Sequence, residues 1–183
     1  MRIIITGGSG FIGQALSRIL IAGGHKVIAL SRSPGTVRFA TGVQSVQWDA
    51  VSAAGWGHLV DADTAIVHLA GESIAGDSFF PRRWSAQMKE RILRSRVQTG
   101  QAVLAAVRAA REKPAVVVQG SAVGFYGTGA DEQFTERSPS GSDFQAQVCR
   151  EWEASTTRPM APITTKARLC SRRMMKSRVS SSR

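Results

Sequence analysis

Three glycines at regular spacing separate two segments of different periodicity near the start of the chain. Residues 1–6 are an apolar run with three consecutive isoleucines, which is typical of a strand buried on both faces of a parallel sheet. Gly7, Gly10 and Gly13 follow directly. Apolar side chains then recur at helical spacing across residues 11–20. The pattern predicts a strand, a tight turn and a helix in immediate succession.

The spacing of these glycines suits a phosphate group. A turn without Cβ atoms lets the backbone approach a ligand closely, and the N–H groups that open the next helix attract negative charge. The strand–turn–helix context makes this pattern more specific than glycines alone. We therefore expect Gly7, Gly10 and Gly13, with Phe11 and Ile12 at the helix start, to bind a dinucleotide pyrophosphate. The alternative is a tight structural turn without a ligand.

The rest of the chain alternates short apolar runs with longer helical patterns. Strands alternating with helices predict an α/β fold, namely a Rossmann-type doubly wound parallel sheet with right-handed crossovers. The expected strands after the first are 27–30, 43–48, 64–69 and 115–119, and the expected later helices are 84–111 and 142–155.

The ends of the second and third expected strands bear on the choice of cofactor. A site for NAD(H) usually carries Asp or Glu after the second strand to bind the ribose 2′-hydroxyl, whereas this chain has Ser31 and Arg32. An arginine suits a 2′-phosphate, so we expect NADP(H) to be preferred over NAD(H), although Arg32 could also be a solvated loop residue. Asp49 follows the third strand, where it could reach the adenine amine or cap the next helix.

The fourth expected strand ends in small residues. Ala70 and Gly71 would let a cofactor lie across the strand ends at the topological switch point. His68 precedes them, and we interpret it as a packed strand residue rather than a catalyst.

The charge is divided unevenly along the chain. The net charge is +11, but residues 1–156 hold all 13 acidic side chains against 16 Lys and Arg, and residues 157–183 hold eight Lys and Arg and no acid. No periodicity is sustained in this last part. We predict two parts: an NAD(P)-binding domain over 1–155 and a basic irregular tail over 156–183, disordered or translated out of frame.

Composition excludes several classes of protein. No apolar run approaches the roughly 18 residues of a membrane span, and the N-terminus predicts a strand rather than a signal peptide, so we expect a cytoplasmic protein. Cys149 and Cys170 have no metal-ligand spacing and are expected to be free thiols. The basic tail lacks interleaved aromatic residues, so we expect neither a nucleic-acid nor a membrane partner.

Several motifs in order resemble the extended short-chain dehydrogenase/reductase superfamily, and within it the atypical, epimerase-like subgroup of NAD(P)-dependent proteins. The resemblance covers about residues 1–155. It rests on Thr6–Gly13, Ser31-Arg32, Leu69–Glu72, Arg82–Trp84, Ser95–Val97, Ser121–Gly127, Thr135-Glu136, Asp143-Phe144 and Trp152-Glu153.

This resemblance implies further parts of the site and the assembly. Leu69, Ala70 and Arg96 are expected near the cofactor. Members carry a smaller C-terminal substrate domain, which is missing here, and a homodimer formed through helices 84–111 and 142–155 would be usual among them.

The resemblance also implies a catalytic group that this chain only partly has. Members typically use Ser or Thr, a tyrosine that exchanges the proton, and a lysine four residues later that lowers the tyrosine pKa. Ser121 occupies the place of the serine and would polarise a substrate oxygen. Phe144 and Val148 occupy the places of the other two. Tyr126, the only tyrosine, is either a substitute acid or a packed loop residue.

Two functions follow from these observations. The first is an NADP(H)-binding epimerase-like oxidoreductase, impaired by the missing domain, that acts on a small molecule such as a sugar nucleotide or a carbonyl compound. The second is a non-catalytic NADP(H)-binding redox sensor or regulatory protein, which the missing Tyr–Lys pair favours.

Overall fold

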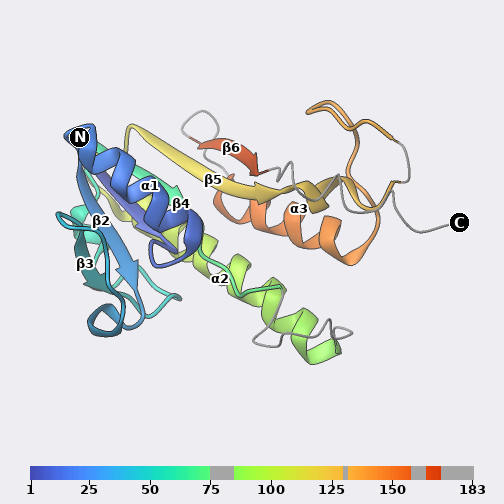
Figure 1. Ribbon diagram of the computed structural model, residues 1–183, viewed down its shortest axis with the longest axis horizontal. Coiled ribbons are helices and arrows are strands. Elements are labelled where there is room, and N and C mark those ends of the chain that lie inside the picture. The colour runs from blue at the N-terminus through green and yellow to red at the C-terminus, as the bar shows by residue number, and fades with distance from the viewer. Residues whose placement is uncertain (75–84, 130–131, 158–163, 170–183) are drawn as a thin grey trace, which may run out of the picture.

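The structure, a computed structural model, describes residues 1–74, 85–129 and 132–157, and the backbone of 164–169. Six parallel strands form one sheet in the order β3-β2-β1-β4-β5-β6 (Figure 1). Their bounds are β1 Arg2–Thr6, β2 Lys26–Ser31, β3 Gln44–Gln47, β4 Thr64–His68, β5 Val116–Ala122 and β6 Thr164–Leu169. The predicted Rossmann-type sheet is confirmed.

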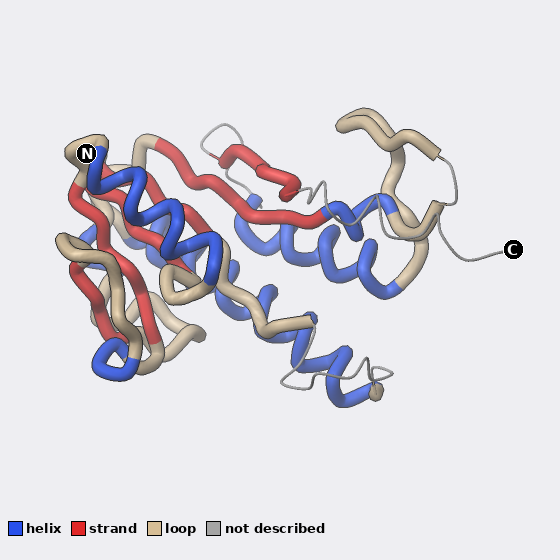
Figure 2. The backbone as a smooth tube through the Cα atoms, viewed as in Figure 1, coloured by secondary structure: helices blue, strands red, loops and turns tan. Residues whose placement is uncertain are grey.

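Helices cover both faces of this sheet. Helix α1 (Phe11–Ala22) lies in front of the strands in Figure 2, whereas α2 (Ala86–Ala109) and α3 (Phe144–Thr157) run behind them. Alternation along β1 explains the two layers, because successive strand side chains point to opposite faces. Ile3 and Ile5 pack on the α1 side, and Ile4 packs on the α2 side.

The buried face of α1 is not its most apolar one. Gly13 and Ser17 are buried and Leu16, Leu20 and Ile21 pack against the core cluster of that face, at the spacing of one helical stripe. Other apolar side chains of the helix are turned outward: Phe11 is 93% and Ile19 69% exposed. The buried stripe thus combines small residues near the glycine turn with apolar side chains further along the helix.

The chain crosses over at β1, which pairs with β2 on one side and β4 on the other. Thr6, the last residue of β1, is in register with Leu30 and His68. Adjacent carboxyl ends whose connections diverge leave a crevice, and in open α/β sheets ligands bind there.

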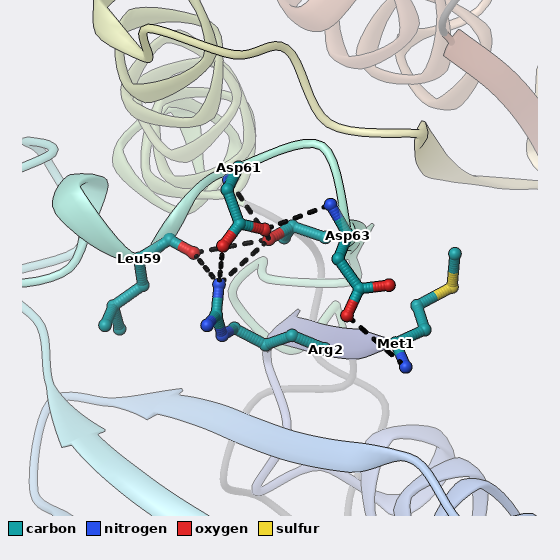
Figure 3. A network of polar contacts seen from close by, with 6 residues as sticks. Met1, Arg2, Leu59, Asp61 and Asp63 are labelled. Atoms are coloured by element: carbon teal, nitrogen blue, oxygen red, sulfur yellow. Dashed lines mark hydrogen bonds and ion pairs between the residues drawn. The ribbon is translucent and has the colours of Figure 1, made fainter.

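A polar cluster fixes the other end of β1 (Figure 3). The Arg2 guanidinium donates to the Leu59 carbonyl at 2.7 Å and to the Asp61 carboxylate at 2.6 Å, and the terminal ammonium lies 3.5 Å from Asp63. Hydrogen bonds from Thr64 and Arg2 lower the pKa of Asp61. The cluster holds the loop before β4 at the end of the sheet opposite the crevice.

The expectation that residues 156–183 are wholly irregular is wrong for Thr164–Leu169. This segment is β6, which pairs in parallel with β5 from Val117↔Thr164 to Ala122↔Leu169. Strand pairing satisfies backbone N–H and C=O groups and needs no side-chain periodicity, so the composition of the tail did not reveal it. Residues 158–163 and 170–183 lie outside the described residues, as do Arg82–Trp84, and the division into two parts stays a prediction.

Candidate functional site

Backbone contact between two strand ends makes Gly7 obligatory. Its φ of +71° favours glycine, and an added Cβ would lie 2.9 Å from the Ala70 nitrogen and from the Leu69 carbonyl carbon. Neither backbone group can move away without disturbing the sheet. The end of β1 therefore touches the loop after β4 directly.

The next two glycines join this turn to α1. The Gly10 amide donates to the Gly7 carbonyl at 3.0 Å. A Cβ on Gly13 would lie 2.5 Å from the Gly7 oxygen, so the first helical turn sits against the loop backbone. Among the described residues no side chain caps the N-terminus of α1. Its opening amides thus offer donors to an anionic ligand.

A cavity of about 370 Å³ opens beside this turn, at the carboxyl ends of β1, β2, β3 and β4. Its position is the crevice that the sheet order predicts. The lining residues are Gly7, Ser9, Gly10, Leu30, Ser31, Arg32, Trp48, Asp49, Ala50, Val51, Leu69, Ala70, Gly71, Glu72, Ser95, Gln98 and Thr99.

Eight residues that sequence analysis proposed for the cofactor line the cavity: Gly7, Gly10, Ser31, Arg32, Asp49, Leu69, Ala70 and Gly71. Phe11, Ile12 and Gly13 adjoin it at the start of α1. Ser95, Gln98 and Thr99 of α2 were missed. Their i, i+3, i+4 spacing places them on one face of the helix, which a search for polar side chains in helical phase could have found.

Arg32 lies at the mouth of the cavity with an exposed side chain. Its backbone carbonyl accepts a 2.6 Å hydrogen bond from the side-chain amide Nε2 of Gln47 in β3, which fixes the backbone there. The preceding Ser31 is buried, and its hydroxyl accepts from the Ser33 amide at 3.2 Å. Arg32 forms no ion pair with any described residue, so its guanidinium is available to bind an anion.

Asp49 also lines the cavity, and it closes a turn at the same time. Its Oδ1 accepts from the Val51 and Ser52 amides, both at 2.9 Å, and its Oδ2 accepts from the Ser52 hydroxyl at 2.6 Å. These bonds lower the pKa of Asp49, and the bond from the Ser52 hydroxyl has the largest effect. Asp49 therefore closes a turn and does not cap a helix, since the next helical element, η2 (Gly57–Leu59), has Trp56 as its N-cap. Contact between Asp49 and adenine stays a prediction.

Two tryptophans pack beside the turn that Asp49 closes. The indole N–H groups of Trp48 and Trp56 both donate to the Ser52 carbonyl, at 2.7 and 3.0 Å. Their rings meet edge to face with centroids 6.0 Å apart. Both are buried, so the two rings hold the backbone of this turn in place.

Arg96 lies behind the cavity rather than in its lining. A Cβ on Gly71 would be 2.9 Å from the Arg96 Cζ, and the guanidinium stacks over the Trp152 ring at 5.2 Å from the ring centroid. It also donates to the Ile92 carbonyl at 3.0 Å. Burial lowers the pKa of Arg96. The expected contact between Arg96 and the cofactor stays a prediction.

His68 is fully buried directly behind the cavity wall, as the sequence predicts for a packed residue. Its Nδ1 lies 2.6 Å from the Thr6 Oγ1, and its Nε2 accepts the Trp152 indole N–H at 3.1 Å. An indole N–H can only donate, so the imidazole is neutral with its proton on Nδ1. Burial of the imidazole, and to a smaller extent the positive charge of Arg96, lowers the pKa of His68 to about 3.

The two predicted catalytic residues lie outside the cavity lining. Ser121 at the end of β5 is 2% exposed, and its hydroxyl donates to the Glu153 Oε1 of α3 at 2.7 Å. Tyr126 ends the short 3-10 helix η3 (Val123–Tyr126), and its ring stacks on Phe134 with centroids 5.2 Å apart. The structure therefore brings neither of them into the lining of the cavity.

The helix that would carry the Tyr–Lys pair presents apolar side chains. Val148 of α3 is buried. Phe144 is half-buried, and the ammonium of Lys89 from α2 lies 5.3 Å from its ring centroid. Lys89 therefore contacts the ring face of Phe144, the residue that occupies the expected place of the tyrosine.

The described residues hold no group of three or more His, Cys, Asp or Glu that could bind a metal ion. Cys149 is a buried free thiol whose pKa is raised by burial, and Cys170 lies outside the described residues. No described helix is both long and apolar enough to cross a membrane.

The sheet order and the glycine turn define a Rossmann-type α/β protein. The model of the NAD dependent epimerase/dehydratase family matches residues 3–149, and the chain belongs to that family. This confirms the epimerase-like resemblance.

Individual relatives agree with this assignment. The chain is 38% identical to epimerase family protein YfhF of Bacillus subtilis over 154 residues, which are 84% of this chain and 48% of YfhF. It is 35% identical to human epimerase family protein SDR39U1 over 160 residues, 87% of this chain and 50% of that protein. The chain thus spans about half the length of the curated relatives it matches.

A solved structure of a relative has the same fold as this chain. The crystal structure of human SDR39U1 (isoform 2) with NADPH superimposes with a TM-score of 0.71 at 32% identity. The match covers 92% of this chain and 52% of the human one. The shared part is the Rossmann sheet with its helices.

Proposed function

We propose that this chain binds NADP(H) in the cavity at the strand ends and belongs to an epimerase-like oxidoreductase. One observation carries the proposal: the Gly7–Gly13 turn, the uncapped start of α1 and the exposed Arg32 all meet at one cavity. The NADPH in the solved structure of human SDR39U1 supports this choice of cofactor.

Each wall of the cavity has a separate role in this proposal. Gly7 and Gly10 bring the backbone close to the pyrophosphate, and the Phe11 and Ile12 amides donate to it at the positive end of the helix dipole. Arg32 contacts the 2′-phosphate. Asp49 faces the adenine side, and Leu69, Ala70 and Gly71 support the cofactor where it crosses β4.

The preference for NADP(H) depends on charge at one position. Arg32→Asp removes the cation and introduces a carboxylate that suits a 2′-hydroxyl. We expect NADPH affinity to fall roughly 10- to 100-fold, the equivalent of about 1.5–3 kcal/mol for a charged hydrogen bond, with NADH affinity unchanged or improved. Isothermal titration of both cofactors measures this.

The matched control is Arg111→Asp. Arg111 is also exposed, and it precedes β5 at the opposite end of the sheet, so the variant changes net charge by the same amount without touching the cavity. Equal loss of NADPH affinity in both variants would contradict a specific role for Arg32. Binding of neither cofactor by the wild-type chain would refute the proposed site.

The chemical step is the next part of the proposal. The bound cofactor would supply hydride transfer, while Ser121 polarises a substrate oxygen and Tyr126 exchanges its proton. Tyr126→Phe keeps the ring that stacks on Phe134 and removes only the hydroxyl, so whatever turnover the wild-type chain shows should vanish without loss of NADPH binding. Because the chain spans about half of its relatives, we expect little or no turnover from these 183 residues alone.

A non-catalytic binder is the second candidate, and two observations favour it. Ser121 is buried with its hydroxyl donated to Glu153, and Phe144 and Val148 stand where a Tyr–Lys pair would act. The absorbance of reduced nicotinamide separates the two functions. Steady change with a sugar nucleotide or carbonyl substrate supports the enzyme, and tight cofactor binding without change supports a sensor or regulatory protein.

A further inference from the structure

A chain of buried hydrogen bonds connects α3 to the wall of the cavity. It begins at the Trp152 indole, passes through both nitrogens of His68 and reaches the Thr6 hydroxyl. The Thr6 Oγ1 in turn accepts from the Leu69 and Ala70 amides, both at 3.2 Å. Every side chain in this series is buried.

The last bond in the series bears on the proposed site. Ala70 lines the cavity, and its nitrogen is one of the two atoms that a Cβ on Gly7 would meet at 2.9 Å. Leu69 also donates to the Thr6 carbonyl at 3.1 Å, so it has a second acceptor. The position of the Ala70 amide therefore depends on the Thr6 hydroxyl.

We propose that His68 is a positioning residue for the nucleotide cavity: through its Nδ1–H it holds the Thr6 hydroxyl where that oxygen fixes the Ala70 amide against the glycine turn. This inference rests on the proposed cofactor site. It adds a residue that does not contact the ligand but sets the spacing between the ends of β1 and β4.

The tautomer makes this role directional. Trp152 occupies Nε2 as a donor, which leaves the proton on Nδ1 and aims it at Thr6. Thr99, a cavity-lining residue of α2, lies 3.4 Å from the same Nε2. The neutral state agrees with a His68 pKa lowered to about 3 by burial.

Two isosteric variants separate the two arms of the imidazole. His68→Asn places an amide nitrogen near the position of Nδ1, so it keeps a donor to Thr6 and loses the acceptor for Trp152. His68→Gln places an amide oxygen near the position of Nε2, so it keeps the acceptor and loses the donor. Thr6→Val and its conservative partner Thr6→Ser test the next atom in the same way.

We expect His68→Gln and Thr6→Val to weaken NADPH binding about tenfold, the effect of one unsatisfied buried polar group. His68→Asn and Thr6→Ser should bind within about threefold of wild type. Hydrogen exchange should show the Ala70 amide less protected in the first pair than in the second. Nitrogen chemical shifts of His68 in the full chain should report the Nδ1–H tautomer.

Equal NADPH affinity and equal Ala70 protection in all four variants would overturn the proposal, as would an Nε2–H tautomer. If the wild-type chain binds no cofactor, the proposed function fails on its own, and exchange at Ala70 still decides the role of His68. If one variant does not fold, comparison of the remaining donor-retaining and donor-lacking variants gives the same decision.

Discussion

The Ser121 hydroxyl donates to the Glu153 Oε1 at 2.7 Å, and both side chains are almost completely buried. The bond joins the end of β5 to α3 one residue beyond Trp152, which is bonded to the end of β4. Two consecutive residues of one helix therefore hold two neighbouring strand ends. This gives Ser121 a structural role whether or not it also contacts a substrate.

Ser121→Ala should destabilise the fold by about 1–3 kcal/mol, because it removes a buried hydrogen bond to the Glu153 carboxylate. Glu153→Gln retains an acceptor oxygen and should cost less. Urea unfolding measures both. Ser45→Ala, on an exposed position of β3, is the control and should change stability by no more than about 0.5 kcal/mol. A Ser121→Ala protein as stable as wild type would show that this bond contributes nothing.

Gly13→Ala should lower stability by about 1–3 kcal/mol and abolish NADPH binding, because the new Cβ would press on the Gly7 oxygen and the Gly8 Cα. These are backbone atoms and cannot rotate away. Calorimetry and cofactor titration give the two readouts. Gly35→Ala is the matched control, since nothing lies within 4 Å of its added Cβ. Normal binding by Gly13→Ala would contradict the packing of α1 on the turn.

The stability of the fold should decrease with falling pH through His68. Its pKa is about 3 in the folded protein and about 6.5 in an unfolded chain, so the unfolded state binds the proton first. The contribution is complete above about pH 6.5 and is lost as the pH falls towards 3, by about 1.4 kcal/mol per pH unit.

Urea unfolding of wild type and His68→Gln between about pH 7 and about pH 5 isolates this contribution. As the pH falls, the free energy of unfolding should decrease more for the wild type than for the variant, because the variant has no imidazole to protonate. A constant difference over this range would mean that His68 titrates alike in both states.

Gly100→Ala should weaken the packing of α2 on α3, since the added Cβ would collide with the Ser155 hydroxyl. We expect a loss of about 1–3 kcal/mol, measured by thermal unfolding. Ser155→Gly in the same chain should restore part of it. Gln101→Ala, at the adjacent exposed position, should have little effect, since Ala is a good helix former. A similar loss there would show that the loss at Gly100 does not come from the contact with Ser155.

The local patterns were sufficient for the sheet and for much of the site. Residues 1–6, the three glycines and the later apolar runs predicted β1, the turn and the parallel strands, because buried strands and glycine turns leave short-range signatures. Arg32 and Asp49 were found because they follow directly after predicted strands, and parallel strands end at one edge of the sheet.

Other features depended on contacts between distant segments. The sequence could not indicate that Trp152 bonds to His68 across 84 positions, that Ser121 is covered by Glu153, or that Phe11 is turned to solvent. It also gave no sign of β6, whose pairing needs only backbone groups.

The physical reason is the range of the forces involved. Amphipathic periods, turn sterics and helix dipoles act between residues close in sequence, so the amino acids by themselves determined the Rossmann sheet and the glycine turn. Burial and the pairing of polar groups inside the core depend on which elements meet. Only the tertiary structure decided that His68 is neutral behind the cavity wall and that Ser121 and Tyr126 lie away from it.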